Sequence, residues 1–148
     1  MIDKKYIVKN LEVNSQKELL ERLGKQLVED RIVKEGFTEA LLEREREFPT
    51  GLPVVPGVAI PHTNGSLVNE DRLLFATLKN PIKFNEMGAG EEDFVDVQVV
   101  ILLAIADGQN HIQTLQKLIG SIQKEGFIKG LVDSKDTEEM ESIIRQYL

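Results

Sequence analysis

The segment from Val95 to Ala106, VDVQVVILLAIA, constrains the fold of this chain more than any other. It contains the longest apolar run, which is rich in β-branched residues and too short to cross a membrane. A run of this kind is typical of a central strand whose two faces are both buried. Because such a sheet must be covered on each side by other elements, the segment predicts a layered α/β domain.

The remaining sequence supplies helices for both layers. Leucines at helical spacing predict a helix over roughly 16–29, with Ser15 and Glu18 forming a capping box. Further helices are predicted with Thr38, Asn110 and Thr137 as their caps, and a shorter helical segment is predicted over 127–132. Shorter strands are predicted at 58–60, 72–78 and 82–84, with a turn at 80–81. We therefore expect one domain over residues 1–148, a mixed β-sheet flanked by helices on both sides.

Composition excludes several functions. The 148-residue chain has a net charge of −7, which opposes nucleic-acid binding, and it has no cysteine for disulfides or thiolate catalysis. It begins without an apolar signal region, so a cytoplasmic protein is expected. Its two histidines lack the spacing of a metal site, and neither a phosphate-binding GxxxxGK[ST] loop nor a G-x-S-x-G motif is present. We expect no metal and no cofactor.

The stretch Phe48–Thr63 holds the main candidate for chemistry. Pro61 ends the strand predicted at 58–60, and His62 follows it at the edge of a turn-forming cluster. A neutral imidazole can attack phosphorus directly, because its ordinary pKa near 6.5 leaves it mostly uncharged at neutral pH. The alternative is a polar residue that closes a strand and has no chemical role. The residues alone leave both interpretations open.

Phosphoryl transfer to His62 would need donors for the phosphoryl oxygens. Thr63, Ser66 and the backbone of Gly65 follow it directly, and an arginine of the preceding helix could form a bidentate clamp. His111 lies at the predicted start of a helix, where a neutral imidazole beside an anion is electrostatically favourable. The alternative for His111 is a polar first-turn residue without a task.

Several segments together resemble the fructose/mannitol-type enzyme IIA domain of the bacterial phosphoenolpyruvate-dependent sugar phosphotransferase system. They are Arg44-Glu45, Pro49-Thr50-Gly51-Leu52, Gly57-Val58-Ala59-Ile60-Pro61-His62 and His111-Ile112-Gln113-Thr114-Leu115. The resemblance extends from about the first helix to Leu148. The longer link Leu52–Pro56 and Thr63, in place of a common glycine, resemble the galactitol-type branch.

The resemblance implies a phosphoryl relay. His62 would be phosphorylated by the carrier protein HPr and would pass the group to a cysteine of enzyme IIB, with only an indirect connection to the membrane through the IIC transporter. Arg44 matches the arginine that helps to bind the phosphoryl group, with Arg46 as a competing candidate, and His111 matches the supporting histidine. Thr50 and Thr63 are added as phosphate-binding donors from their chemistry.

Two other functions fit the same residues. One is a regulatory domain of the same fold whose phosphorylation is a signal, as in nitrogen-type phosphotransferase systems. The other is a non-catalytic binding domain in which both histidines are structural. Phosphorylation of a histidine would distinguish the non-catalytic binding domain from the phosphoryl relay and from the regulatory domain, because only the last two accept phosphate.

Overall fold

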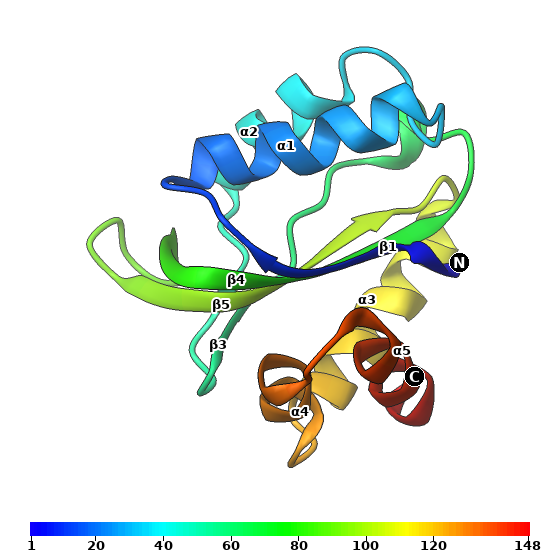
Figure 1. The fold of residues 1–148 in the computed structure, drawn as a ribbon. Helices are drawn as coiled ribbons and strands as arrows, with labels where there is room; N and C mark the ends of the chain where they lie inside the picture. Colours follow the sequence, from blue (N-terminus) through cyan, green and yellow to red (C-terminus); the bar gives the residue numbers. More distant parts are fainter.

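The computed structural model describes residues 1–148, and in it two helical layers enclose one β-sheet (Figure 1). The strands are β1 (Ile2–Leu11), β2 (Gly51–Leu52), β3 (Gly57–Ala59), β4 (Arg72–Asn85) and β5 (Phe94–Ala104). The helices are α1 (Gln16–Glu29), α2 (Phe37–Glu47), α3 (Gly108–Ile122), α4 (Phe127–Asp133) and α5 (Thr137–Tyr147), with a 3₁₀ turn η1 (Gly65–Leu67). None of the helices is both long and apolar enough to cross a membrane.

The sheet is mixed, with strand order β1-β4-β5-β3-β2. β4 and β5 form its centre as a long antiparallel pair, β1 joins β4 in parallel, and β3 joins β5 in parallel. The short β2 pairs antiparallel with β3 and completes the edge. Helices α1 and α2 cover one face and α3, α4 and α5 cover the other (Figure 1), as the sequence predicted.

Alternation along β5 builds the two cores. Val100, Leu102 and Ala104 pack in the cluster that contains α1 and α2, whereas residues 99, 101 and 103 pack in the cluster that contains α3, α4 and α5. All six are essentially inaccessible to solvent. Full burial of a large aliphatic side chain contributes about 1.5–3 kcal/mol, so this strand is a main source of stability. The prediction of a doubly buried central strand is confirmed.

Two strands depart from the predictions: no strand is predicted for residues 1–14, and β4 joins the two strands predicted at 72–78 and 82–84. Residues 1–14 contain the ten-residue strand β1, in which only Tyr6 and Ile7 are buried and the apolar run is limited to residues 6–8. The expected turn at Asn80-Pro81 is instead an irregularity within the continuous strand β4, between the pairs Thr77–Val99 and Ile82–Val97. A proline can occupy a strand where the ladder is interrupted, because its missing N–H then breaks no pairing.

Three helices are capped by residues that precede the predicted caps Thr38, Asn110 and Thr137. Gly36 precedes α2 with a left-handed backbone (φ 93°), which displaces Thr38 into the first turn. Asp107 caps α3 by accepting from the N–H of Asn110, and Asp136 caps α5 in the same way. The interval of α1, by contrast, is as predicted, with Ser15 accepting from the N–H of Glu18.

Candidate active site

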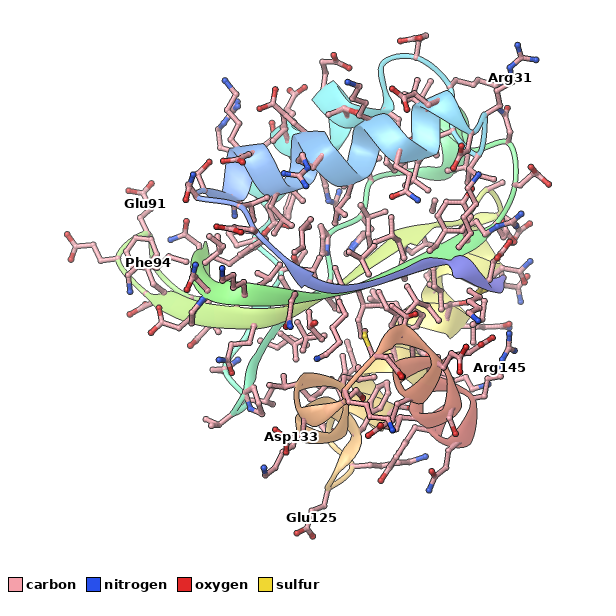
Figure 2. All side chains as sticks on the ribbon, in the orientation of Figure 1. Arg31, Glu91, Phe94, Glu125, Asp133 and Arg145 are labelled. Carbon is pink, nitrogen blue, oxygen red and sulfur yellow. The ribbon has the colours of Figure 1, made fainter.

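His62 lies where the chain leaves the sheet beside the end of β5. After β3, the N–H of Leu103 donates to the Pro61 carbonyl at 3.1 Å, and His62 forms an isolated parallel bridge with Leu103. This is the carboxyl end of β5. Phe94, at the opposite end of the strand, lies on the outer tip of the β4–β5 hairpin (Figure 2), on the order of 30 Å away for a strand of this length.

The loop after His62 packs tightly on the segment that leads into α3. A Cβ atom at Gly65 would collide with the backbone carbonyl oxygens of Ile105 and Ala106. Only glycine allows this approach, which brings the His62 loop and the start of α3 together. The residue expected to donate to a phosphoryl group therefore has a clear packing function as well.

The His62 ring is fixed in one tautomer by its own backbone. Its Nδ1 lies 2.7 Å from the carbonyl oxygen of Ile60. A carbonyl only accepts hydrogen bonds, so Nδ1 carries the proton and Nε2 keeps its lone pair. The side chain is otherwise buried, with 9% of the residue exposed. Nε2 is the nitrogen available for nucleophilic attack.

His111 meets His62 across the two segments. The ring centroids lie 4.9 Å apart in an edge-to-face arrangement, with an interplanar angle of 67°. His111 belongs to the first turns of α3, where its N–H donates to the carbonyl of the capping residue Asp107. The structure thus brings together the two histidines that the sequence singled out.

Both imidazoles are held in the neutral form. Burial lowers the pKa of His62 below its ordinary value of 6.5, and the nearby His111 and Arg44 lower it further against the opposing effect of the Ile60 hydrogen bond. Burial, followed by the charge of Arg44, also lowers the pKa of the half-buried His111. A nucleophilic nitrogen must be unprotonated, so this environment suits attack on an electrophile.

Arg44 faces this site from the last turn of α2. It lines a shallow pocket of about 230 Å³ together with Thr63 and Asn64, and its charge acts on both histidines. Arg46 does not line that pocket, and it is not among the groups that shift the pKa of either histidine. Glu43 and Glu47 also line the pocket, so Arg44 is its only cation.

The two threonines predicted as phosphate donors have different positions. Thr63 is buried and lines the pocket beside Arg44. Thr50 is also buried, but its hydroxyl and its N–H both donate to the carboxyl group of Glu45, each at 2.7 Å. The hydroxyl proton of Thr50 is therefore already donated to Glu45, and a role of Thr50 as a phosphate donor stays a prediction.

Glu45 lies in one of the segments that carry the family resemblance, but the sequence assigns it no role. It belongs to the charged run 43–47, which predicts a solvated face for most of its members. Yet Glu45 falls four residues after Leu41 and eight after Phe37, on the buried face of α2. That helical spacing is the signal that distinguishes it from its neighbours.

The sequence matches over residues 1–147 the family described as "Phosphoenolpyruvate-dependent sugar phosphotransferase system, EIIA 2". The chain belongs to this family. It is 26% identical over 132 residues to the galactitol-specific EIIA component of Escherichia coli (strain K12), covering 88% of this chain and 87% of that protein. It is 28% identical over 138 residues to the mannitol-specific enzyme IIA component of Staphylococcus aureus (strain MRSA252), covering 93% and 90%.

Solved structures agree with this assignment. The nitrogen regulatory protein IIA-Ntr of Neisseria meningitidis is 27% identical with a TM-score of 0.80, covering 97% of this chain and 95% of that one. Enzyme IIA-Mtl of E. coli, in its complex with phosphorylated IIB-Mtl, has a TM-score of 0.79 at 22% identity, covering 99% of each chain. The predictions of the family, of a phosphotransferase-system component and of the fold are confirmed.

Proposed function

We propose that this EIIA-family protein accepts a phosphoryl group on Nε2 of His62 from HPr and passes it to a cysteine of an enzyme IIB. The observation that carries the proposal is the 2.7 Å contact between Nδ1 of His62 and the Ile60 carbonyl, which leaves Nε2 as the free nucleophile. The site's neutral imidazoles and single facing cation support the same chemistry.

Each transfer exchanges one bond to phosphorus for another. The Nε2 lone pair attacks phosphorus while the donor's P–N bond breaks, and its electron pair returns to the donor imidazole. The His62 ring gains positive charge as the new P–N bond forms, and the Ile60 carbonyl stabilises it through the Nδ1 proton. In the second transfer a IIB thiolate attacks phosphorus, and the electrons of the P–N bond return to Nε2.

The neighbouring side chains assist by position and charge. The Arg44 guanidinium neutralises the phosphoryl oxygens, for which it supplies several donors in a fixed fork, and Thr63 can donate beside it. His111 limits the rotation of the His62 ring by its edge-to-face contact. Positioning and charge neutralisation supply most of the catalysis in phosphoryl transfer, so this set needs no further nucleophile or base.

Similarity supports a polyol as the transported compound. The relatives include galactitol-specific and mannitol-specific components at nearly equal identity. The longer link Leu52–Pro56 and Thr63 favour galactitol or a related polyol. The partner IIB and its IIC transporter would determine this specificity, and transfer from this protein to galactitol-type and mannitol-type IIB components distinguishes the two.

The test is intact-mass analysis after incubation with phosphoenolpyruvate, enzyme I and HPr. We expect one acid-labile phosphoryl group on the wild type and none on His62→Ala, with the group lost again when a IIB component is added. A His62→Ala variant that is still labelled would assign the nucleophile elsewhere. An unlabelled wild type would leave the non-catalytic binding domain as the function.

A second candidate is a regulatory EIIA domain. The similarity to IIA-Ntr of Neisseria meningitidis, at 27% identity and a TM-score of 0.80, favours it. Such a domain would accept phosphate on His62 in the same way but would not pass it to IIB components. Stable phospho-protein in the presence of galactitol-type and mannitol-type IIB would support this alternative.

A further inference from the structure

Glu45 is a buried carboxyl group at the end of α2. Only 3% of the residue is exposed, and none of the salt bridges in the structure involves it. Its Oε2 accepts from the N–H of Thr50 and its Oε1 from the Thr50 hydroxyl, both at 2.7 Å. Burial of a carboxyl group without a cation is unfavourable, so its presence calls for a function that offsets the loss of stability.

A continuous path of hydrogen bonds leads from Glu45 to the nucleophile. Glu45 holds Thr50, and the carbonyl oxygen of Thr50 accepts a hydrogen bond from the N–H of Ile60 at 3.3 Å. The carbonyl of Ile60 in turn accepts from Nδ1 of His62 at 2.7 Å. The position of that carbonyl therefore depends on where Thr50 lies, and Glu45 fixes Thr50 at two points.

We propose that Glu45 is a positioning residue for His62, which holds the Thr50–Ile60 backbone so that the Ile60 carbonyl keeps the proton on Nδ1 and leaves Nε2 free. The proposal rests on the proposed function of His62. It assigns to Thr50 a role as the partner of Glu45 rather than as a phosphate donor.

The location of Glu45 also explains why a polar anchor is used here. Between Glu45 and Thr50 the chain turns through Phe48 and Pro49, outside any regular element, and must pass from α2 into the sheet edge. Pro49 has no N–H to donate, and the two bonds to the carboxyl group span the turn directly. They tie the last turn of α2, which carries Arg44, to Thr50 directly before β2, and Thr50 in turn pairs with Ile60 shortly before His62.

Burial raises the pKa of Glu45 to about 7, and the two hydrogen bonds from Thr50 act in the opposite direction. The N–H of Thr50 can only donate, so Oε2 must accept in either protonation state. The contact between Oε1 and the Thr50 hydroxyl is present in both states, because a hydroxyl can also accept. It is charge-assisted, and roughly twice as strong, only when the carboxyl group is ionised, a state that a glutamine cannot provide.

The test uses three variants that break the link, two control variants and two readouts. Glu45→Gln removes the carboxylate, Thr50→Val removes the hydroxyl with nearly the same shape, and the double variant removes both. For each, the rate of phosphorylation is measured as a function of phospho-HPr concentration, and the tautomer of His62 is measured by ¹⁵N NMR of its ring nitrogens in the unphosphorylated protein.

We expect Glu45→Gln and Thr50→Val each to lower kcat about tenfold at nearly unchanged KM, as loss of one charge-assisted hydrogen bond would. Both should increase the Nε2-protonated tautomer of His62. The double variant should be no slower than the slower single variant, because both changes break the same link. Thr50→Ser, which keeps the hydroxyl, should restore the wild-type values.

The exposed Glu39→Gln on the same helix is the matched control for loss of one negative charge. Wild-type kcat and an unchanged His62 tautomer in Glu45→Gln and Thr50→Val would overturn the proposal. So would a double variant whose loss is the product of the single losses, since Thr50 would then act on phosphate independently. If Glu45→Gln does not fold, Thr50→Val and Thr50→Ser decide alone.

The tautomer readout needs no phosphoryl transfer. If the wild type is never phosphorylated, the proposed function fails, and the NMR comparison still decides whether Glu45 positions the ring. If the wild type is phosphorylated and the variants keep the Nδ1-protonated tautomer, only the positioning role fails.

Discussion

The guanidinium carbon of Arg44 lies 4.3 Å from the centroid of the Phe48 ring. Arg44 is the cation that faces the two histidines, and Phe48 is 56% exposed one turn later in the chain. The ring therefore forms a shelf under the guanidinium group. An exposed aromatic shelf of this kind restricts a long, flexible side chain through a cation–π contact of about 0.5–1 kcal/mol.

Removal of this shelf should slow phosphoryl acceptance without affecting the fold. We expect Phe48→Leu to reduce the rate about two- to fivefold, the factor that corresponds to the cation–π energy. Phe48→Tyr keeps the aromatic face and should behave as the wild type. Rapid-quench measurement of His62 phosphorylation checks both. Equal rates for the leucine and tyrosine variants would show that the ring acts only by its bulk.

Arg44 and Arg46 should differ in their importance. Arg44 lines the pocket with Thr63 and Asn64, whereas Arg46 does not. A hydrogen bond from a charged donor contributes about 1.5–3 kcal/mol, so its loss from the transition state in Arg44→Ala should slow transfer roughly 10- to 100-fold. Arg46→Ala, which removes the same charge from the same helix, should stay within about twofold of the wild type. Stopped-flow rates in the reverse order would exchange the two assignments.

The sequence predicts the central strand and its helices because periodicity reports burial. The interval of α1 follows from its leucines and its cap, and β5 follows from its apolar run. β1 carries a weaker signal, a short apolar run at residues 6–8. It is an edge strand paired with β4 alone, and only two of its ten positions are buried, so most of its sequence is polar.

The sequence predicts those site residues that lie next to a recognisable end of a strand or start of a helix. His62 follows a proline that ends a strand, and His111 follows a helix cap, so both are visible in the sequence. The 4.9 Å contact between their rings cannot be read from the sequence, because it depends on the packing of Gly65 against the backbone that follows β5. Glu45 was hidden among four other charged residues, and only the three-dimensional path to Ile60 reveals what it holds.

Both histidines should titrate below pH 6.5. Burial and the charge of Arg44 favour their neutral forms, so each proton is lost at a lower pH than in a model peptide. Arg44→Gln removes the positive charge and should raise both pKa values, while leaving the effect of burial. Titration of the ring nitrogens by ¹⁵N NMR measures this directly. Unchanged midpoints in Arg44→Gln would mean that its guanidinium does not act on the imidazoles.

Glu45 should make the protein less stable as the pH rises towards neutrality. Burial raises its pKa from 4.5 to about 7 in the folded state. Between these values the folded protein binds more protons at this site than the unfolded chain, so stability falls as pH increases. The stabilisation is fully present below about pH 4.5 and is lost above about pH 7. The shift corresponds to roughly 3 kcal/mol.

Glu45→Gln carries no titrating proton at this position, so its stability should lack that component. We expect the difference in free energy of unfolding, wild type minus Glu45→Gln, to decrease by roughly 3 kcal/mol between pH 4.5 and pH 8. The difference cancels the other carboxyl groups, and exposed Glu39→Gln controls for the charge itself. Urea unfolding followed by circular dichroism gives each value. A difference that does not change with pH would show that the Glu45 carboxyl is ionised throughout, held by Thr50 strongly enough to overcome its burial.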